Sequence, residues 1–167
     1  MLLRFAVIAV FVLLGEYAQA ETILALPLSL QEQSDQDNRA RELALQQTTL
    51  AKHDAQRGEK TAAMGRIQKA IELAAQIQGV RKRTVALVDI AAMQAEVGDI
   101  QGALQTANFI QSPTERDSTL RIMALDRAKV GDLDNAKLFS NAIQDNWKKT
   151  DATSYIDALQ SAKSIGY

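Results

Sequence analysis

The chain of 167 residues contains no cysteine, and this absence excludes several kinds of structure and chemistry. Disulfide bonds, thiolate metal ligands and thiol nucleophiles all require cysteine. Histidine occurs only once, at His53, so a zinc site with two histidine ligands is excluded as well. We expect His53, which follows a lysine on a predicted helix, to be a solvated surface residue, with pH sensing as the alternative.

Proline and aromatic residues are also scarce. The only prolines are Pro27 and Pro113, and aromatic residues make up 5% of the chain. Alanine and glutamine are abundant, and both favour helices when few residues interrupt them. The composition therefore predicts an all-α protein. The net charge of −1 offers no electrostatic attraction for nucleic acid or anionic lipid, so we expect neither as a partner.

The N-terminus has the pattern of a secretory signal peptide. Arg4 precedes a short apolar run over residues 5–14, and Ala18-Gln19-Ala20 supplies the small residues of a cleavage site. We predict a signal peptide over residues 1–20 with cleavage after Ala20, and hence a periplasmic or secreted protein. The alternative is a retained membrane anchor, although the apolar run is about half of the roughly 20 residues needed to cross a bilayer.

Residues 21–38 differ from the rest of the chain. They carry several leucines interrupted by Pro27, which disfavours a helix. We predict an extended N-terminal arm lying on the first helical hairpin, or alternatively a segment inserted into a partner. Asp35 or Asp37 would then cap the first helix of a domain over residues 39–167.

An internal repeat dominates this domain. The segments 97–110, "VGDIQGALQTANFI", and 130–143, "VGDLDNAKLFSNAI", resemble each other at an offset of 33 in the numbering. Apolar residues before each segment recur at steps of three and four, as in an amphipathic helix. Gly98 and Gly131 are expected to end helices over 83–97 and 113–130.

Further signals complete this pattern of helical hairpins. Asp99 and Asp132 are expected to cap the second helix of each hairpin, and Ser112 to cap the helix that begins at Pro113. Upstream, the pattern recurs around Gly58 at an offset of 40, with a longer second helix over 59–78. Downstream, residues 156–163 repeat 122–129 at an offset of 34 and form a closing helix without a partner.

Small and large apolar residues take different places in these hairpins. Small residues let two helix backbones approach closely at the hairpin crossing. We assign this role to Ala51, Ala91, Ala124 and Ala158 in the first helices and to Ala63, Ala103 and Ala136 in the second. Larger residues are expected to fill the space between hairpins, and Trp147 to seal the last hairpin against the closing helix. The larger residues are Leu87, Ile90, Leu104, Ile110, Leu120, Met123, Leu133, Leu138 and Ile143.

The hairpin length and the small residues at the crossing make the chain similar to tetratricopeptide (TPR) repeats over about residues 40–165. It departs from the family where large aromatic residues would stand, having Leu87, Gln94, Leu120 and Arg127. The resemblance implies an α-solenoid of about three hairpins plus a closing helix, with a concave groove lined by the first helices. The candidate groove residues for binding a partner are Lys52, Asp89, Glu96, Arg121, Leu125 and Lys129.

No pattern of catalytic or metal-binding residues is found. Asp132 to Ile143 lacks the glycine and the distal glutamate of a calcium loop, and phosphate-binding loops are absent. We therefore expect neither an enzyme nor a bound cofactor or metal. The basic cluster Arg81-Lys82-Arg83, placed near the C-terminal end of a helix, is interpreted as a solvated turn, with contact to an anion or acidic peptide as the alternative.

These observations predict a periplasmic adaptor or scaffold whose groove binds another protein or peptide of the cell envelope, without membrane insertion after signal cleavage. The alternative is a structural accessory subunit of a membrane-associated complex, tethered by the N-terminal apolar segment.

Overall fold

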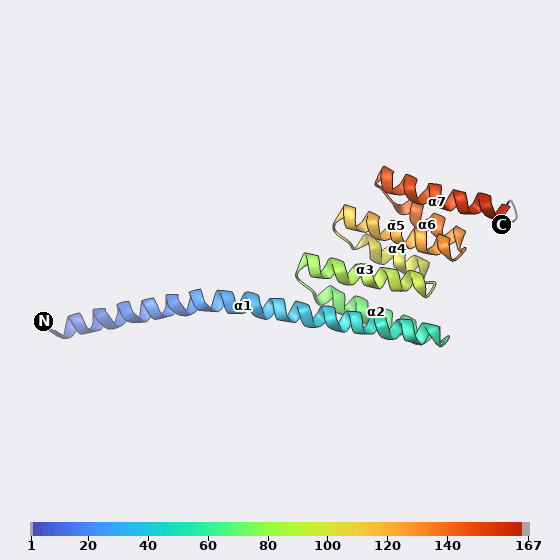
Figure 1. The fold of residues 1–167 in the computed structure, drawn as a ribbon. Coiled ribbons are helices and arrows are strands. Elements are labelled where there is room, and N and C mark those ends of the chain that lie inside the picture. The colour runs from blue at the N-terminus through green and yellow to red at the C-terminus, as the bar shows by residue number, and fades with distance from the viewer. Residues whose placement is uncertain (1, 165–167) are drawn as a thin grey trace.

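The computed structural model describes the backbone of residues 2–164 and the side chains of residues 29–164. The described residues form helices joined by short turns and contain no strand (Figure 1), so the predicted all-α class is confirmed. The helices are α1 (Leu2–Gln56), α2 (Lys60–Gln76), α3 (Val80–Glu96), α4 (Ile100–Asn108), α5 (Pro113–Lys129), α6 (Leu133–Ala142) and α7 (Asn146–Ser164).

Consecutive helices pack as pairs. Helix α1 packs on α2, α3 on α4 and α5 on α6, while α7 packs on both α5 and α6. Helices α1, α3, α5 and α7, here called the first helices, also contact their neighbours in that order and form one layer (Figure 1). Helices α2, α4 and α6, the second helices, form the other layer. The side of the first helices that faces away from the second helices is thus left uncovered.

Glycine ends the first helix of every pair. Gly58, Gly98 and Gly131 have φ angles of 79°, 84° and 81°, in the left-handed region that other residues adopt only at a cost. Each stands at the C-terminal end of a first helix, where this conformation allows the chain to reverse direction. The predicted roles of Gly98 and Gly131 are confirmed.

The predicted caps of α4, α5 and α6 are confirmed as well. The carboxylate of Asp99 accepts a hydrogen bond from the backbone N–H of Gly102 at 3.0 Å. Asp132 accepts one from the backbone N–H of Asn135 at 3.4 Å. The Ser112 hydroxyl accepts one from the N–H of Glu115 at 3.3 Å. These caps explain why α4, α5 and α6 begin where they do, because each satisfies an N–H without a partner in the helix.

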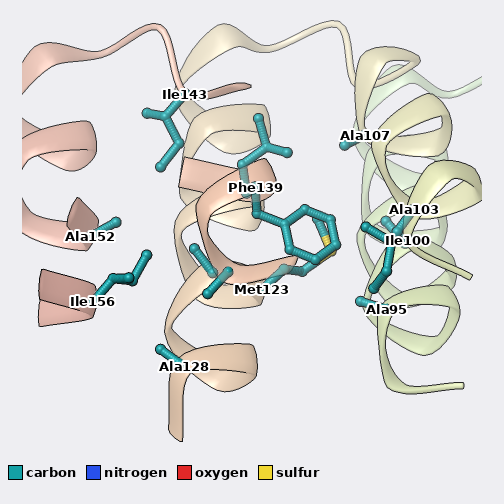
Figure 2. Packing of buried hydrophobic residues seen from close by; sticks show 14 residues of the cluster. Ala95, Ile100, Ala103, Ala107, Met123, Ala128, Phe139, Ile143, Ala152 and Ile156 are labelled. Atoms are coloured by element: carbon teal, nitrogen blue, oxygen red, sulfur yellow. The ribbon is translucent and has the colours of Figure 1, made fainter. Parts of the chain in front are cut away.

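Alanine is buried within each helix pair. Six of the seven predicted crossing alanines have no exposed surface, namely Ala51, Ala63, Ala91, Ala103, Ala124 and Ala136. The predicted larger residues fill the space around them, except that Leu138 is 44% exposed. Leu138 is wrongly assigned because it lies on the outer side of α6. Phe139, one residue further on, is fully buried and points between the pairs beside Met123 (Figure 2).

The closing helix is present, but its predicted register is wrong. The buried residues of α7 correspond to those of α3 and α5 at an offset of 33: Ile90, Met123 and Ile156 are all buried. The predicted offset of 34 matches Ile156 with Ile122, which is 52% exposed. Ala158 is exposed, because among the described residues no further helix follows α7 to form a pair with it.

The N-terminal arm is not extended. Helix α1 runs without interruption from Leu2 to Gln56, through Pro27 and through both expected boundaries at residues 20 and 38. Good helix formers on either side of the proline favour this continuation. The boundaries 1–20, 21–38 and 39–167 stay predictions, as does signal cleavage, and side chains 1–28 lie outside the described residues. In the part of the chain that is described, no helix is both long and apolar enough to cross a membrane.

Asp37 lies within α1 and does not cap it. Its carboxylate accepts hydrogen bonds from the backbone N–H groups of Gln78 at 2.8 Å and Gly79 at 2.7 Å, in the turn before α3. These backbone bonds hold the pKa of Asp37 below its usual value, in competition with desolvation. Helix α2 has 17 residues and α4 only 9, so this turn meets α1 about two helical turns further back. That contact anchors residues predicted to belong to the arm.

Asp117 of α5 makes the same kind of contact two pairs further on. Its carboxylate accepts hydrogen bonds from the N–H groups of Gln144 at 3.2 Å and Asp145 at 2.7 Å, in the turn before α7. The guanidinium of Arg116 donates to its other oxygen at 3.0 Å. A buried carboxylate is tolerated here because several donors replace its hydration.

The basic cluster lies in the first turn of α3, not near the C-terminal end of a helix. The ammonium of Lys82 donates to the backbone oxygen and the hydroxyl of Ser34, both at 3.0 Å. Arg83 donates to the carbonyl of Ile77 at 3.3 Å, and Arg81 is exposed. Two of the three cations therefore fasten α1 and the preceding turn to α3.

Candidate interaction surface

The uncovered side of the four first helices presents both charged and apolar side chains. We call it the first-helix face. On α5 the exposed positions follow helical spacing, and the corresponding positions of the other first helices lie at offsets of 33 or 40. The residues of this face used below are Arg41, Leu45, Lys52, Val85, Asp89, Ala92, Glu96, Arg121, Ile122, Leu125, Lys129, Trp147, Asp151 and Tyr155.

All six candidate groove residues predicted from the sequence lie on this face. Lys52 of α1 and Glu96 of α3 form an ion pair at 3.0 Å, with both side chains about half exposed. Leu125 of α5 is half-buried. The Lys52–Glu96 pair joins neighbouring first helices, so these two charges already have partners within the chain.

Arg121 connects α5 to α7 through two contacts. Its guanidinium forms an ion pair with Asp151 at 2.5 Å, and its central carbon lies 5.7 Å from the centre of the Trp147 ring. The second contact is a cation–π interaction, which adds attraction at an exposed site. Trp147 is 71% exposed, so the prediction that it seals the last hairpin is wrong. It sits in the first turn of α7, where it faces outward.

The remaining two charged candidates, Lys129 and Asp89, each have an opposite charge nearby. Lys129 donates a hydrogen bond to Asp126 at 2.8 Å, and this bond together with the charge of Asp126 raises the pKa of Lys129. Asp89 is exposed, yet desolvation by the surrounding helices raises the pKa of its carboxyl, and the charge of Arg41 on α1 opposes this shift. Lys52–Glu96 and Arg121–Asp151 therefore pair between helices, whereas Lys129 pairs within α5.

Exposed apolar side chains come from every first helix, and the sequence analysis missed most of them. Leu45 of α1 is 51% exposed, Val85 of α3 40%, Ile122 of α5 52% and Tyr155 of α7 39%. The register at offset 33 could have revealed part of this set, because Ile122 and Tyr155 occupy corresponding positions. With Trp147, they give the face an aromatic and aliphatic character that resembles the core of protein interfaces.

A hollow of about 350 Å³ lies between α3 and α5 near their C-terminal ends. Its apolar surface comes from alanine, isoleucine, methionine and valine side chains, including Ala92, Ile122 and Val130. Charged side chains from the last turns of the two helices surround it. The hollow is therefore a small apolar depression with a polar rim, placed on the first-helix face.

The described side chains form no group of three or more histidine, cysteine, aspartate or glutamate residues that could hold a metal ion. Every buried side-chain nitrogen and oxygen among them has a hydrogen-bond partner. His53 is exposed near the end of α1, and its side chain takes part in no hydrogen bond or ion pair within residues 29–164.

Comparison of the chain with protein-family models, with curated proteins and with solved structures found no match.

Proposed function

We propose that this chain is a periplasmic adaptor that binds a segment of another cell-envelope protein on its first-helix face. The proposal includes an α-solenoid of TPR-like hairpins, formed by the three helix pairs and closed by α7. It also takes the N-terminal residues as a cleaved signal peptide, as their charged start and short apolar run favour. Recognition, not catalysis, is the proposed activity.

The observation that carries this proposal is the exposed aromatic and aliphatic content of the face. Trp147 at 71% and Ile122 at 52% exposure lie on neighbouring helices, and both are large side chains of the kind that anchor protein interfaces. Contiguous exposed apolar surface is uncommon on monomers unless it binds something. Burying such side chains against a partner would supply the main driving force for binding.

The charge pairs of the face support the same function in another way. Lys52–Glu96 and Arg121–Asp151 each join two first helices. Exposed pairs contribute little to stability, roughly 0–1 kcal/mol each. Their physical effect is to restrict long side chains before a partner arrives, which lowers the ordering cost of binding.

Site-specific photo-crosslinking tests the proposal with a matched pair of positions. Ile122 and Leu138 belong to the same helix pair and are similarly exposed, at 52% and 44%, but they lie on opposite layers. A photoreactive amino acid at position 122, expressed in the native host, is expected to give one discrete crosslinked partner in the envelope fraction. The same residue at position 138 is expected to give none. Equal crosslinking from both positions, or none from position 122, would contradict the proposal.

A second candidate function is a structural accessory subunit tethered by its N-terminal segment. The continuity of α1 favours it, because one helix leads from the N-terminal apolar residues into the first helix pair. Cell fractionation separates the two functions. An adaptor with a cleaved leader leaves the envelope on osmotic shock, with a mature N-terminus at Glu21 in mass spectrometry, whereas a tethered subunit stays with the membranes until detergent is added.

A further inference from the structure

The three helix pairs differ at one corresponding position of their first helices. Asp54 in α1, Gln94 in α3 and Arg127 in α5 occupy it, at successive offsets of 40 and 33. Asp54 and Gln94 are 2% and 3% exposed. Each is satisfied by the second helix of its own pair: Asp54 accepts a hydrogen bond from Arg66 at 2.5 Å, and Gln94 accepts one from Thr106 at 2.6 Å.

The third pair has no such partner for Arg127. The position of Arg66 and Thr106 is taken by Phe139, which is fully buried and offers no hydrogen-bond acceptor in its side chain. In Figure 2 its ring points from α6 toward Ile100 of α4, so it fills the space between two pairs. A guanidinium in the direction of Gln94 would therefore be buried against an aromatic ring without compensation.

The capping aspartate of the third pair is also occupied. In the second pair the amide of Gln94 donates to Asp99 at 3.0 Å. In the third pair the corresponding Asp132 receives its hydrogen bond from the side chain of Asn135, at 2.9 Å. Gln94 is held inward by Asp99 and Thr106. Their counterparts in the third pair, Asp132 and Phe139, do not bind Arg127 in this way.

Arg127 lines the hollow between α3 and α5 and is half-buried there. Its side chain forms no hydrogen bond or ion pair with any residue from 29 to 164. The other charges at the rim are neutralised: Glu96 by Lys52 at 3.0 Å, and Asp126 by Lys129 at 2.8 Å. The hollow consequently combines apolar walls with one uncompensated positive charge. The C-terminal end of α5 favours a cation at this place but supplies no counter-ion.

We propose that this hollow binds an apolar side chain of a partner segment while Arg127 pairs with a carboxylate of an Asp or Glu close to it in that segment. The inference rests on the proposed function and specifies the chemistry of the partner. An arginine can hold a carboxylate through two parallel hydrogen bonds, which fixes the position of the segment as well as adding affinity. The apolar walls then bury the neighbouring side chain.

A random peptide library displayed on phage and selected against the full chain tests this inference. We expect the enriched peptides to carry an Asp or Glu within a few residues of Leu, Ile, Met or Phe. For a synthetic copy of an enriched peptide, Arg127→Gln is expected to weaken binding about tenfold or more, as loss of a charge-assisted pair predicts. The measurement is fluorescence anisotropy at two salt concentrations.

Arg39→Gln is the matched control. Arg39 is an exposed arginine of α1 in a separate depression lined by Glu42 and Leu43, and its loss changes the net charge equally. It is expected to leave peptide affinity unchanged. Arg127→Glu combined with a peptide whose acidic residue is replaced by lysine is expected to restore binding. Far-UV circular dichroism of each variant confirms that it is folded.

Other outcomes would overturn the inference: peptides enriched without an acidic residue, affinity equally insensitive to Arg127→Gln and Arg39→Gln, or no peptide enriched at all. Peptides that lose affinity on Trp147→Ala but not on Arg127→Gln would overturn it while leaving the proposed function intact. Failure of the crosslinking at position 122, by contrast, would remove the proposed function itself.

Discussion

In the first two pairs, a polar side chain near the end of the first helix is hydrogen-bonded to the second helix. In the third pair, an aromatic ring takes the place of the hydrogen-bonding residue on the second helix. Asp54–Arg66 and Gln94–Thr106 are hydrogen-bonded across the two layers, but the position corresponding to Arg66 and Thr106 in the third pair is Phe139. The backbone stays the same in all three, with a left-handed glycine after each first helix. One packing arrangement thus accepts different side-chain chemistry, and the change leaves the cation of Arg127 on the surface.

The largest expected effect comes from giving the third helix pair the residues that the second pair has at the corresponding positions. Phe139→Thr removes a fully buried ring and should destabilise the chain by about 3 kcal/mol, because large-to-small changes in a core leave a cavity. Adding Arg127→Gln creates in the third pair the Gln–Thr hydrogen bond that the second pair has, and should recover about 1 kcal/mol of stability. Urea denaturation of the single and double variants measures both values. Additive effects would contradict the structural correspondence of these positions.

A smaller effect distinguishes alanines at a crossing from an alanine without a second helix. Ala124→Leu should cost about 1–3 kcal/mol by overpacking, and Ala91→Leu a similar amount. Ala158→Leu in α7 is the control and should change stability by less than about 0.5 kcal/mol, because this alanine is exposed. Thermal denaturation compares the three. A loss of stability for Ala158→Leu as large as for Ala124→Leu would contradict this register and support the offset of 34 for the closing helix.

The two capping aspartates should differ by a still smaller amount. Asp132→Ala should cost about 1 kcal/mol for the lost cap. Asp99→Ala should cost about 2 kcal/mol, since it also leaves the buried amide of Gln94 without its acceptor. Chemical denaturation at neutral pH resolves this difference. Equal losses would indicate that Gln94 finds another partner or reaches water.

The smallest effect is confined to acid. The folded-state pKa of Asp37 lies below its unfolded value of 3.8, so its contribution to stability is complete above that pH and is lost as the pH falls toward the folded pKa. Asp37→Asn should therefore show a shallower loss of stability below about pH 4 than the original chain. Asp35→Asn, on the same helix and exposed, is the control. Parallel acid profiles for the chain and Asp37→Asn would refute the assignment.

The backbone plan could be predicted from the sequence because it depends on local signals. Glycine followed by aspartate marks a turn between helices, and alanine at fixed spacing marks a close crossing, so Gly98, Asp99 and Ala91 were assigned correctly. The register of α7 was not, since the repeated letters around Ile156 match better at an offset of 34 than at the offset of 33 that packing requires.

Contacts between distant segments could not be read from the sequence. Asp37 meets the turn at Gln78 because α2 is long, and the exposed ring of Trp147 contacts Arg121 of another helix. Helical spacing predicted that the six candidate residues lie on first helices, and the structure places them on α1, α3 and α5. Their mutual pairing, and the exposed Ile122 and Tyr155, depend on how the first helices are aligned side by side.

Solvent exchange of arginine side-chain N–H protons, measured by NMR on the labelled chain, tests the central comparison most directly. The Nε–H of Arg66, bonded to Asp54 at 2.5 Å, is expected to exchange slowly. That of Arg127 is expected to exchange rapidly in the free chain and to slow markedly when an acidic, apolar peptide saturates the hollow. Exchange at Arg127 as slow as at Arg66 without peptide would show that its charge is already paired and would contradict the account.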